Sequence, residues 1–231
     1  MPKYYPIMLD VRQRPALVIG GNSIAAEKAA ALCASGAVVT VMNPDFCEEL
    51  LSMQQRRQVT LRYKLYEPGD LAGAFVVVAA SNDPQQIEAI WSETQQRGQL
   101  VNIVDVPARC SFILPSILRR DQLTIAVSTE GASPGLAKRI RQRLESLFPP
   151  AYGAYLRLAA IAREHMRGQG VSYARRDDFF GDFFNSEILS FLAEKNERAA
   201  LAAAVNLLHN YHIDIAPETL AIGLKEAGES R

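Results

Sequence analysis

The sequence predicts a doubly wound α/β fold, a Rossmann-like and mostly parallel sheet, followed by a smaller helical domain. Through the first half of the chain, short runs that are apolar on both faces alternate with amphipathic stretches. This pattern is typical of parallel strands that are covered by helices on each side. A glycine turn follows the first run, and after about residue 150 the strand-like runs give way to helical ones.

Short apolar runs are expected to be the strands of this sheet. They are residues 16–20, 38–42, 59–63, 75–81, 100–106 and 123–129. Because each run is apolar on both faces, it suits a strand buried between two layers of helices. We therefore expect all of them in the parallel sheet.

The helices between these runs carry start and stop signals. Residues 23–35 end at Gly36, and residues 84–97 begin with Pro84 and end at Gly98. Proline at the first helical position and glycine just past the last one are the usual arrangement. The same signals predict a helix from Pro134, with Ser133 as its N-cap.

The charge balance and the cysteine content exclude several classes of protein. Lys plus Arg and Asp plus Glu both total 25, so no overall charge favours nucleic acid or a membrane surface as partner. The apolar runs are too short to span a bilayer, and the N-terminus lacks a signal-peptide core; we expect a cytoplasmic protein. Cys33, Cys47 and Cys110 show no CxxC spacing, which disfavours a disulfide framework or a thiolate metal site, and no metal is expected.

The turn after the first expected strand resembles a degenerate G-x-G-x-x-G motif. Its three glycine positions hold Gly20, Asn22 and Ala25, with Gly21 between the first two. Gly20 permits the tight turn, and small Ala25 permits close packing of helix on strand. Asn tolerates a positive φ better than most residues, so the turn can still form. A strand-turn-helix without any nucleotide is the alternative.

The second strand ends at Asn43, where a dinucleotide site often has an acid that binds the ribose hydroxyls. We expect Asn43 to replace that acid with a neutral hydrogen bond. Asp45, Glu48 and Glu49 follow, and their charges would repel a 2′-phosphate. If the turn binds a dinucleotide, NAD is therefore favoured over NADP.

Asp105 is the candidate catalytic residue. It leaves the fifth expected strand at the carboxyl end, where ligands bind in doubly wound sheets. A partly desolvated carboxylate at such a place would have its pKa raised toward the range of a general base. The alternative is an Asp that merely forms a turn.

Residues 107–143 form a basic region with seven Lys and Arg against two acids. Such a region would suit a polycarboxylate or a polyphosphate. The alternative is a solvated helix face, above all for residues 138–143.

Four stretches, taken in order, resemble the precorrin-2 dehydrogenase and sirohydrochlorin ferrochelatase family, which also forms part of siroheme synthases. They are "VIGGNSIAAEKAAALCASGAVVTVM", "VVAASNDPQQ", "VNIVDVPARCSFILPSILRR" and "LTIAVSTEGASPGLAKRIRQRLE". The resemblance implies NAD-dependent oxidation of precorrin-2 to sirohydrochlorin in siroheme biosynthesis, with cobalamin biosynthesis as a further branch. It leaves open whether the chain also inserts ferrous iron, as some members do. Because the chain stops at residue 231, we expect the form without a methyltransferase module.

The resemblance also implies a homodimer and three parts of the chain. These are an NAD-binding domain (1–114), a dimerisation segment with the last strand and helix (115–150), and a helical domain (151–231). By position, Asp105 matches the family's proton-abstracting aspartate. The implied cofactor-binding residues are Gly20, Gly21, Asn22, Ser23, Ile24, Asn43, Ala80, Ser81 and Asn82. The expected substrate-binding residues are Arg109, Arg119, Arg120, Ser128, Thr129 and Ser133.

Two other functions fit the same residues. One is a non-catalytic NAD-binding module that senses redox state, in which Asp105 only forms a turn. The other is an NAD oxidoreductase that acts on a different small anionic substrate. Asp105 together with the basic excess of residues 107–143 favours an enzyme, because a sensor would not need both.

Overall fold

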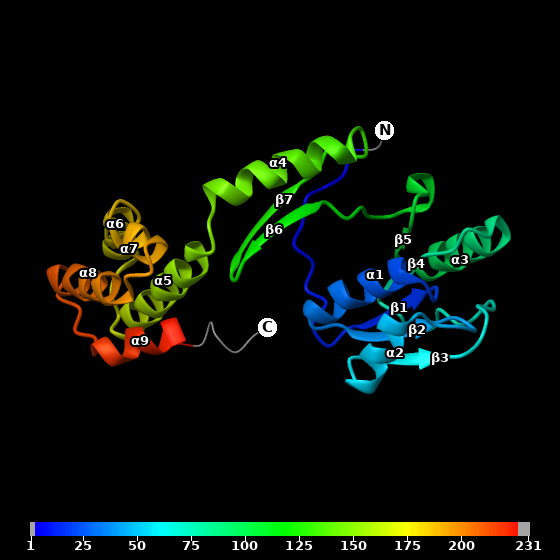
Figure 1. Cartoon of the computed structure of the whole chain (residues 1–231), viewed down its shortest axis with the longest axis horizontal. Coiled ribbons are helices and arrows are strands. Elements are labelled where there is room, and N and C mark those ends of the chain that lie inside the picture. The colour runs from blue at the N-terminus through cyan, green and yellow to red at the C-terminus, as the bar shows by residue number, and fades with distance from the viewer. Residues whose placement is uncertain (1–2, 226–231) are drawn as a thin grey trace. The chain divides into compact units, whose positions relative to one another are not determined.

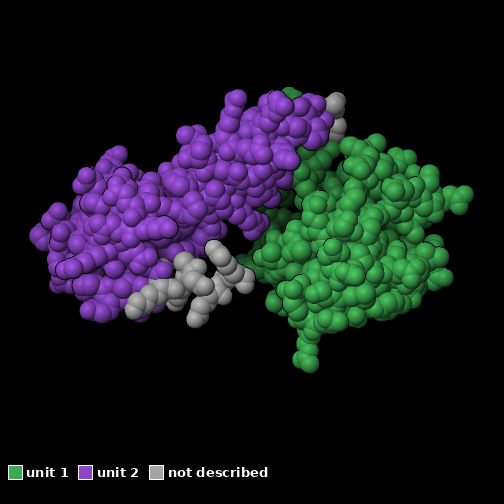
Figure 2. Space-filling view, viewed as in Figure 1, with its two compact units in different colours: residues 1–114 green, residues 115–231 purple. Residues whose placement is uncertain are grey.

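The computed structural model describes residues 3–225 and divides into two compact units (Figure 2), residues 1–114 and residues 115–231. Unit 1 has the bounds expected for the NAD-binding domain. Unit 2 contains both the expected dimerisation segment and the expected helical domain. No helix among residues 3–225 is long and apolar enough to cross a membrane.

Unit 1 is built on a parallel five-stranded sheet with the order β3-β2-β1-β4-β5. The strands are β1 (Pro15–Ile19), β2 (Val38–Met42), β3 (Val59–Arg62), β4 (Val76–Ala79) and β5 (Leu100–Ile103). All five were predicted from their apolar runs. The chain passes from β1 outward to β3 and then returns to the other side of β1 as β4, so the order reverses between β1 and β4.

Alternate residues of β1 face two separate cores, as a sheet covered on both sides requires. Ala16 and Val18 belong to the core that also contains Ala25, Ala29 and Leu50 of the helices α1 (Ser23–Ala34) and α2 (Glu48–Gln55). Leu17 and Ile19 belong to the other core, with Ile90 of α3 (Pro84–Arg97). The doubly wound α/β class is thereby confirmed (Figure 1).

The predicted helix signals are confirmed at α3. Asp83 is its N-cap and accepts a hydrogen bond from the Gln85 N–H at 2.9 Å, and Pro84 is its first residue. Gly98 ends the helix in the left-handed conformation, with φ 65°. Glycine reaches this conformation without steric cost.

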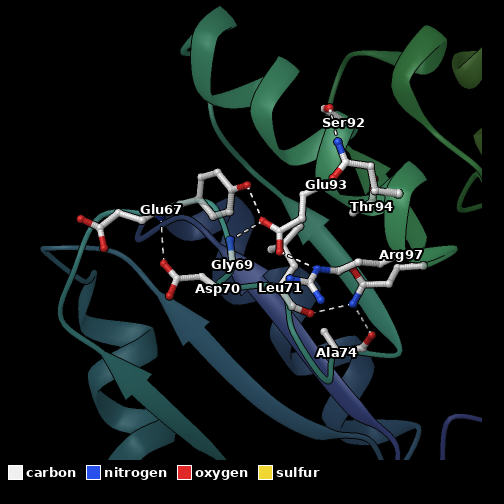
Figure 3. Close-up of polar contacts among 12 residues, drawn as sticks. Glu67, Gly69, Asp70, Leu71, Ala74, Ser92, Glu93, Thr94 and Arg97 are labelled. Carbon is white, nitrogen blue, oxygen red and sulfur yellow. Dashed lines mark hydrogen bonds and ion pairs between the residues drawn. The ribbon is translucent and has the colours of Figure 1, made fainter.

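The carboxylate of Glu93, near the end of α3, holds the connection between β3 and β4 through hydrogen bonds (Figure 3). Glu93 is 7% exposed. It accepts hydrogen bonds from the Tyr66 hydroxyl and the Gly69 N–H, both at 2.8 Å, and from the Arg97 Nε at 2.7 Å. These partners offset the cost of taking the charge out of water.

The prediction that residues 123–129 join the parallel sheet is wrong. In unit 2, β7 (Leu123–Val127) pairs antiparallel with β6 (Ser116–Arg120) in a separate two-stranded sheet. Only Asp121, at φ 56°, and Gln122 connect them. Two residues can join antiparallel strands but not parallel ones. Strand β6 was not predicted, because it has only two strongly apolar residues and ends in two arginines.

The remainder of unit 2 is helical, as the sequence predicts. Its helices are α4 (Pro134–Leu147), α5 (Ala151–Gly168), α6 (Tyr173–Phe184), α7 (Ile188–Ala193), α8 (Glu197–Asn210) and α9 (Pro217–Lys225). Helices α5 to α9 share one apolar core, in which Leu158, Phe179, Phe183 and Leu208 are almost fully buried. Ser133 caps α4 by accepting the Leu136 N–H at 3.3 Å, as expected.

Candidate functional site

A pocket of about 570 Å³ lies at the carboxyl ends of β1 and β4, the two neighbouring strands between which the strand order reverses. The reversal of strand order at this point is the place where doubly wound sheets bind their ligands. The pocket is lined by Gly20, Gly21, Asn22, Asn43, Asp45, Phe46, Cys47, Ala80, Ser81, Asn82, Asp83 and Gln86. Every expected cofactor-binding residue except Ser23 and Ile24 is among them.

Gly20 is required by the turn and by its neighbours. Its φ is 137°, and a Cβ at this position would lie 3.0 Å from the Ala80 carbonyl oxygen and 3.3 Å from the Ala25 Cβ. Ala25 itself is completely buried. Strand β4 and helix α1 therefore approach the first turn so closely that only small residues fit, as the first and third positions of the motif require.

Gly21 is required by the loop that follows β2. A Cβ on Gly21 would overlap the Asp45 carbonyl oxygen and lie 2.5 Å from the Asn43 Nδ2. The Gly21 carbonyl in turn accepts the Cys47 N–H at 2.7 Å. The bare backbone of Gly21 thus joins the first turn to the second, and both turns line the same pocket.

Asn22 does not have the positive φ that a residue replacing the second glycine could have adopted. Its φ is −91°, and it is the N-cap of α1, where its Oδ1 accepts the Ala25 N–H at 3.0 Å. Asn is among the best N-cap residues because its short side chain reaches back to the first turn. The Asn22 side chain therefore accepts one N–H of the first turn of α1. The N–H groups of Ser23 and Ile24, in the same turn, have no acceptor within the helix.

Asn43 holds the second turn. One N–H of its Nδ2 donates to the Asp45 carbonyl at 2.6 Å, and the residue lines the pocket, where a hydrogen bond to a ribose was expected. Asp45 lines the pocket with an exposed side chain. In the sequence, Asp45 was interpreted only as a charge that repels a phosphate. Its place two residues past Asn43 is a signal that also makes it a candidate for the acid of this site.

The turn after β4 forms the opposite wall of the pocket, as expected for Ala80, Ser81 and Asn82. The Ala80 N–H donates to the Ile19 carbonyl at 2.7 Å, which continues the pairing of β4 with β1. The Ser81 Oγ accepts the Asp83 N–H at 3.2 Å. Local hydrogen bonds thus fix this wall in place.

Asp105 follows β5, next to β4 in the sheet, so it leaves the same edge of the sheet as the glycine turn. Its φ is 61°, in the left-handed region, within a turn closed by the hydrogen bond from the Val106 N–H to the Ile103 carbonyl at 3.2 Å. The side chain is exposed. The expected partial burial is therefore not present in this chain by itself, because the turn carries Asp105 beyond the end of the strand.

Arg109 is engaged within unit 1. Its guanidinium forms an ion pair with Glu88 of α3 at 3.0 Å and lies 5.8 Å from the centre of the Trp91 ring. A direct contact with substrate was expected for Arg109. In this structure its ion pair with Glu88 connects the segment that follows Asp105 to α3.

The other expected substrate-binding residues belong to unit 2. The Arg120 Nε donates to the Phe148 carbonyl at 2.8 Å, while Arg119 is exposed on β6. The three hydroxyl residues hold the loop before α4: the Ser128 Oγ accepts the Glu130 N–H, and the Thr129 Oγ1 accepts the Ser133 N–H, both at 3.0 Å. Within residues 3–225 no group of three or more His, Cys, Asp or Glu could hold a metal ion.

Two family models match the chain, one after the other. Residues 7–116 match the model described as "Putative NAD(P)-binding". Residues 120–147 match the model described as "Sirohaem biosynthesis protein central". The first match corresponds to unit 1, and the second begins in β6 and ends with α4.

Curated relatives are siroheme synthases. The protein of Methylobacillus flagellatus is 36% identical over 203 residues, which are 88% of this chain and 44% of the relative. That of Photorhabdus laumondii is 35% identical over 190 residues, which are 82% of this chain and 40% of the relative. The chain thus spans less than half the length of these relatives.

A solved structure described as "SirC, precorrin-2 dehydrogenase" superimposes with a TM-score of 0.71 at 27% identity. The match covers 90% of this chain and 99% of that one, so it extends well beyond unit 1. Together with the ordered family matches, this likeness identifies the chain as a member of the family of precorrin-2 dehydrogenases and siroheme synthases.

Proposed function

We propose that the chain oxidises precorrin-2 to sirohydrochlorin with NAD, as a step of siroheme biosynthesis in the cytoplasm. The observation that carries this proposal is the pocket at the strand-order reversal, walled by Gly20 and Gly21, on the same sheet edge as Asp105. A nucleotide site and a carboxylate at one edge are what a dehydrogenase needs to remove a hydride and a proton from one substrate.

The walls of the pocket fit a dinucleotide. Gly20 and Gly21 line the pocket without side chains, and the first turn of α1 offers N–H groups to a pyrophosphate. Bound NAD would supply the acceptor for the substrate's hydride. The exposed Asp45 carboxylate is suited to hold ribose hydroxyls. Together with Glu48 and Glu49 in the first turn of α2, it disfavours a 2′-phosphate, which supports NAD over NADP.

Asp105 is the proposed proton acceptor. Its side chain is exposed and has no hydrogen bond or ion pair within the described residues 3–225, so its oxygens remain available to a substrate. The left-handed turn fixes the backbone at this point. A positioned carboxylate of this kind typically contributes a factor of about 10² to 10⁴ to a proton transfer.

We propose that Arg119, Arg120, Ser128, Thr129 and Ser133 contact the substrate, whose carboxylates suit arginines and hydroxyls.

We further propose a homodimer formed through residues 115–150, with residues 151–231 as a helical domain. Exposed apolar side chains support this: Ile117 is 39% exposed, Leu136 50% and Leu147 66%. Sedimentation of the protein should give a dimer that Ile117→Asp dissociates. A monomeric wild type would refute the dimer.

The test of the proposed activity is an anaerobic assay of the purified chain with precorrin-2 and either NAD or NADP. Sirohydrochlorin absorbance should rise with NAD and much more slowly with NADP. We expect Asp45→Ser to reduce the preference for NAD over NADP by about tenfold, because this ratio corresponds to the loss of about one hydrogen bond to a charged group. NAD binding without turnover would instead favour a redox sensor, and turnover of another anionic substrate would favour the second alternative.

Iron insertion is measured in the same assay. Ferrous iron is added to sirohydrochlorin with and without the protein. Two pyrrole protons must leave as the metal enters, and Asp105 is the candidate to accept them. A rate equal to the uncatalysed one would mean that the chain is a dehydrogenase only.

A further inference from the structure

The thiol of Cys110 lies inside the turn that carries Asp105. Its Sγ is 3.2 Å from the Ile103 nitrogen, 3.2 Å from the Ile103 carbonyl oxygen and 3.3 Å from the Val106 carbonyl oxygen. The sulfur therefore contacts the residues on both sides of Val104 and Asp105. Burial raises the pKa of this thiol, so it remains a neutral S–H that both accepts and donates.

These contacts replace a missing strand. Because β5 is at the edge of the sheet, its outward N–H groups have no neighbouring strand. The Ile103 N–H finds the Cys110 sulfur, and the Val101 N–H finds the Ser111 Oγ at 2.8 Å. Unpaired backbone donors at an edge are costly unless satisfied, so these two side chains stabilise the end of β5 from which the turn departs.

An ion pair provides a second contact that holds the segment after Asp105. Between Asp105 and Cys110 lies the 3-10 helix η1 (Pro107–Arg109), whose last residue forms the ion pair with Glu88. The pair connects η1 to α3. The side chain of Arg109 is 40% exposed and that of Glu88 59%, so the pair contributes modestly. The half-buried Cys110, in contrast, makes three contacts with the backbone of the turn itself.

We propose that Cys110, and to a smaller extent Arg109, are positioning residues that hold the turn of residues 103–106 and thereby the carboxylate of Asp105. This inference rests on the proposed function only for its effect on turnover. Neither side chain needs to touch the substrate. A left-handed residue at the end of a short strand is costly in backbone energy. The contacts of Cys110 and the ion pair of Arg109 stabilise Asp105 in this conformation.

The variant that tests this proposal is Cys110→Ala, with Cys33→Ala as the matched control. Cys33 is likewise half-buried and donates to a carbonyl, that of Gln58, at 3.3 Å, but it belongs to α1. We expect Cys110→Ala to lower kcat about tenfold with the Kd of NAD within about twofold, since neither residue lines the pocket. The kcat of Cys110→Ser should lie between those of Cys110→Ala and the wild type, because the serine hydroxyl can form the same hydrogen bonds at longer distances.

Amide hydrogen exchange gives a readout that does not depend on turnover. Peptides covering residues 101–112 should exchange faster in Cys110→Ala than in the wild type, and should not change in Cys33→Ala. Unchanged exchange together with unchanged kcat in Cys110→Ala would overturn the proposal. If the wild type does not oxidise precorrin-2, the proposed function fails, and the exchange experiment still decides whether Cys110 holds the turn. If Cys110→Ala does not fold, Cys110→Ser is judged by the same two measurements.

Glu88→Gln tests the role of Arg109 without changing it. If Arg109 positions the turn, we expect kcat to fall about two- to threefold with KM unchanged, in keeping with an exposed ion pair. If Arg109 instead binds the carboxylates of the substrate, its release from Glu88 should lower KM. That second result would overturn the positioning role of Arg109.

Discussion

Two carboxylates of unit 1, Glu93 and Asp105, lie in opposite surroundings. Glu93 is 7% exposed and accepts hydrogen bonds from Tyr66, Gly69 and Arg97. Asp105 is exposed and, within residues 3–225, its side chain has no such partner. A buried charge with hydrogen-bond partners stabilises the fold, because removing the charge would leave those partners buried and without a bond. A charge at a strand end without partners adds nothing to the fold and is available for chemistry.

The largest loss of stability is expected at the buried carboxylate. In Glu93→Gln, one of the donors now bonded to Glu93 must face the new NH₂ group, so at least one hydrogen bond is lost in a buried place. We expect the free energy of unfolding to fall by about 2 kcal/mol, measured by urea unfolding, with the Kd of NAD unchanged.

The control for this prediction is Glu67→Gln. Glu67 is an exposed carboxylate of the same connection and is bonded to Lys64 at 2.8 Å. Exposed ion pairs contribute about 0–1 kcal/mol, so this variant should be close to the wild type. Equal losses in the two variants would contradict the distinction between buried and exposed carboxylates.

Acid should remove the difference between wild type and Glu93→Gln. Burial tends to raise the pKa of Glu93, but the bonds from Gly69, Tyr66 and Arg97 outweigh it and hold the pKa below the ordinary 4.5. A carboxyl whose pKa is lowered by folding stabilises the protein above its unfolded pKa and loses that contribution as the pH falls through the folded one. The stability difference should therefore be constant at neutral pH and shrink below pH 4.5. A difference that grows in acid would refute this reasoning.

A small loss of stability is expected at the first turn of α1. Asn22→Gly removes the side chain that accepts the Ala25 N–H and so frees one more donor for a pyrophosphate. Replacing an N-cap Asn by Gly costs only a few tenths of a kcal/mol. We expect the Kd of NAD to fall about three- to tenfold, measured by titration calorimetry.

Asn196→Gly provides the comparison for that variant, because Asn196 caps α8 in the same manner and accepts the Ala199 N–H at 3.1 Å. It should lose a similar small amount of stability with no change in NAD binding. Weaker NAD binding in Asn22→Gly would mean that the Asn22 side chain itself holds the cofactor.

Local signals in the sequence predicted most of unit 1. Pro84 at the start and Gly98 at the end fix α3 through the conformations that these residues prefer, and the small residues Gly20 and Ala25 identify the first turn. The β6–β7 hairpin was misread because strand pairing depends on which segments meet, and not on the apolar character of one run.

The details of the site depended on contacts between distant segments. The pairing of Arg109 with Glu88, twenty-one positions earlier, and the insertion of Cys110 into its turn follow from folding the chain. Likewise, Asn22 could be read as a tolerated substitute for glycine, but only its φ shows that it is an N-cap. Sequence spacing places residues at one edge of a sheet, while their partners decide what they do there.

The most direct measurement is the kcat of Asp105→Asn in the anaerobic precorrin-2 assay. Asn tolerates the left-handed conformation as Asp does, so the variant removes the base without straining the turn. We predict an unchanged free energy of unfolding and an unchanged Kd of NAD, with kcat reduced by at least roughly a hundredfold. Turnover within about twofold of the wild type would contradict the assignment of Asp105 to the chemistry.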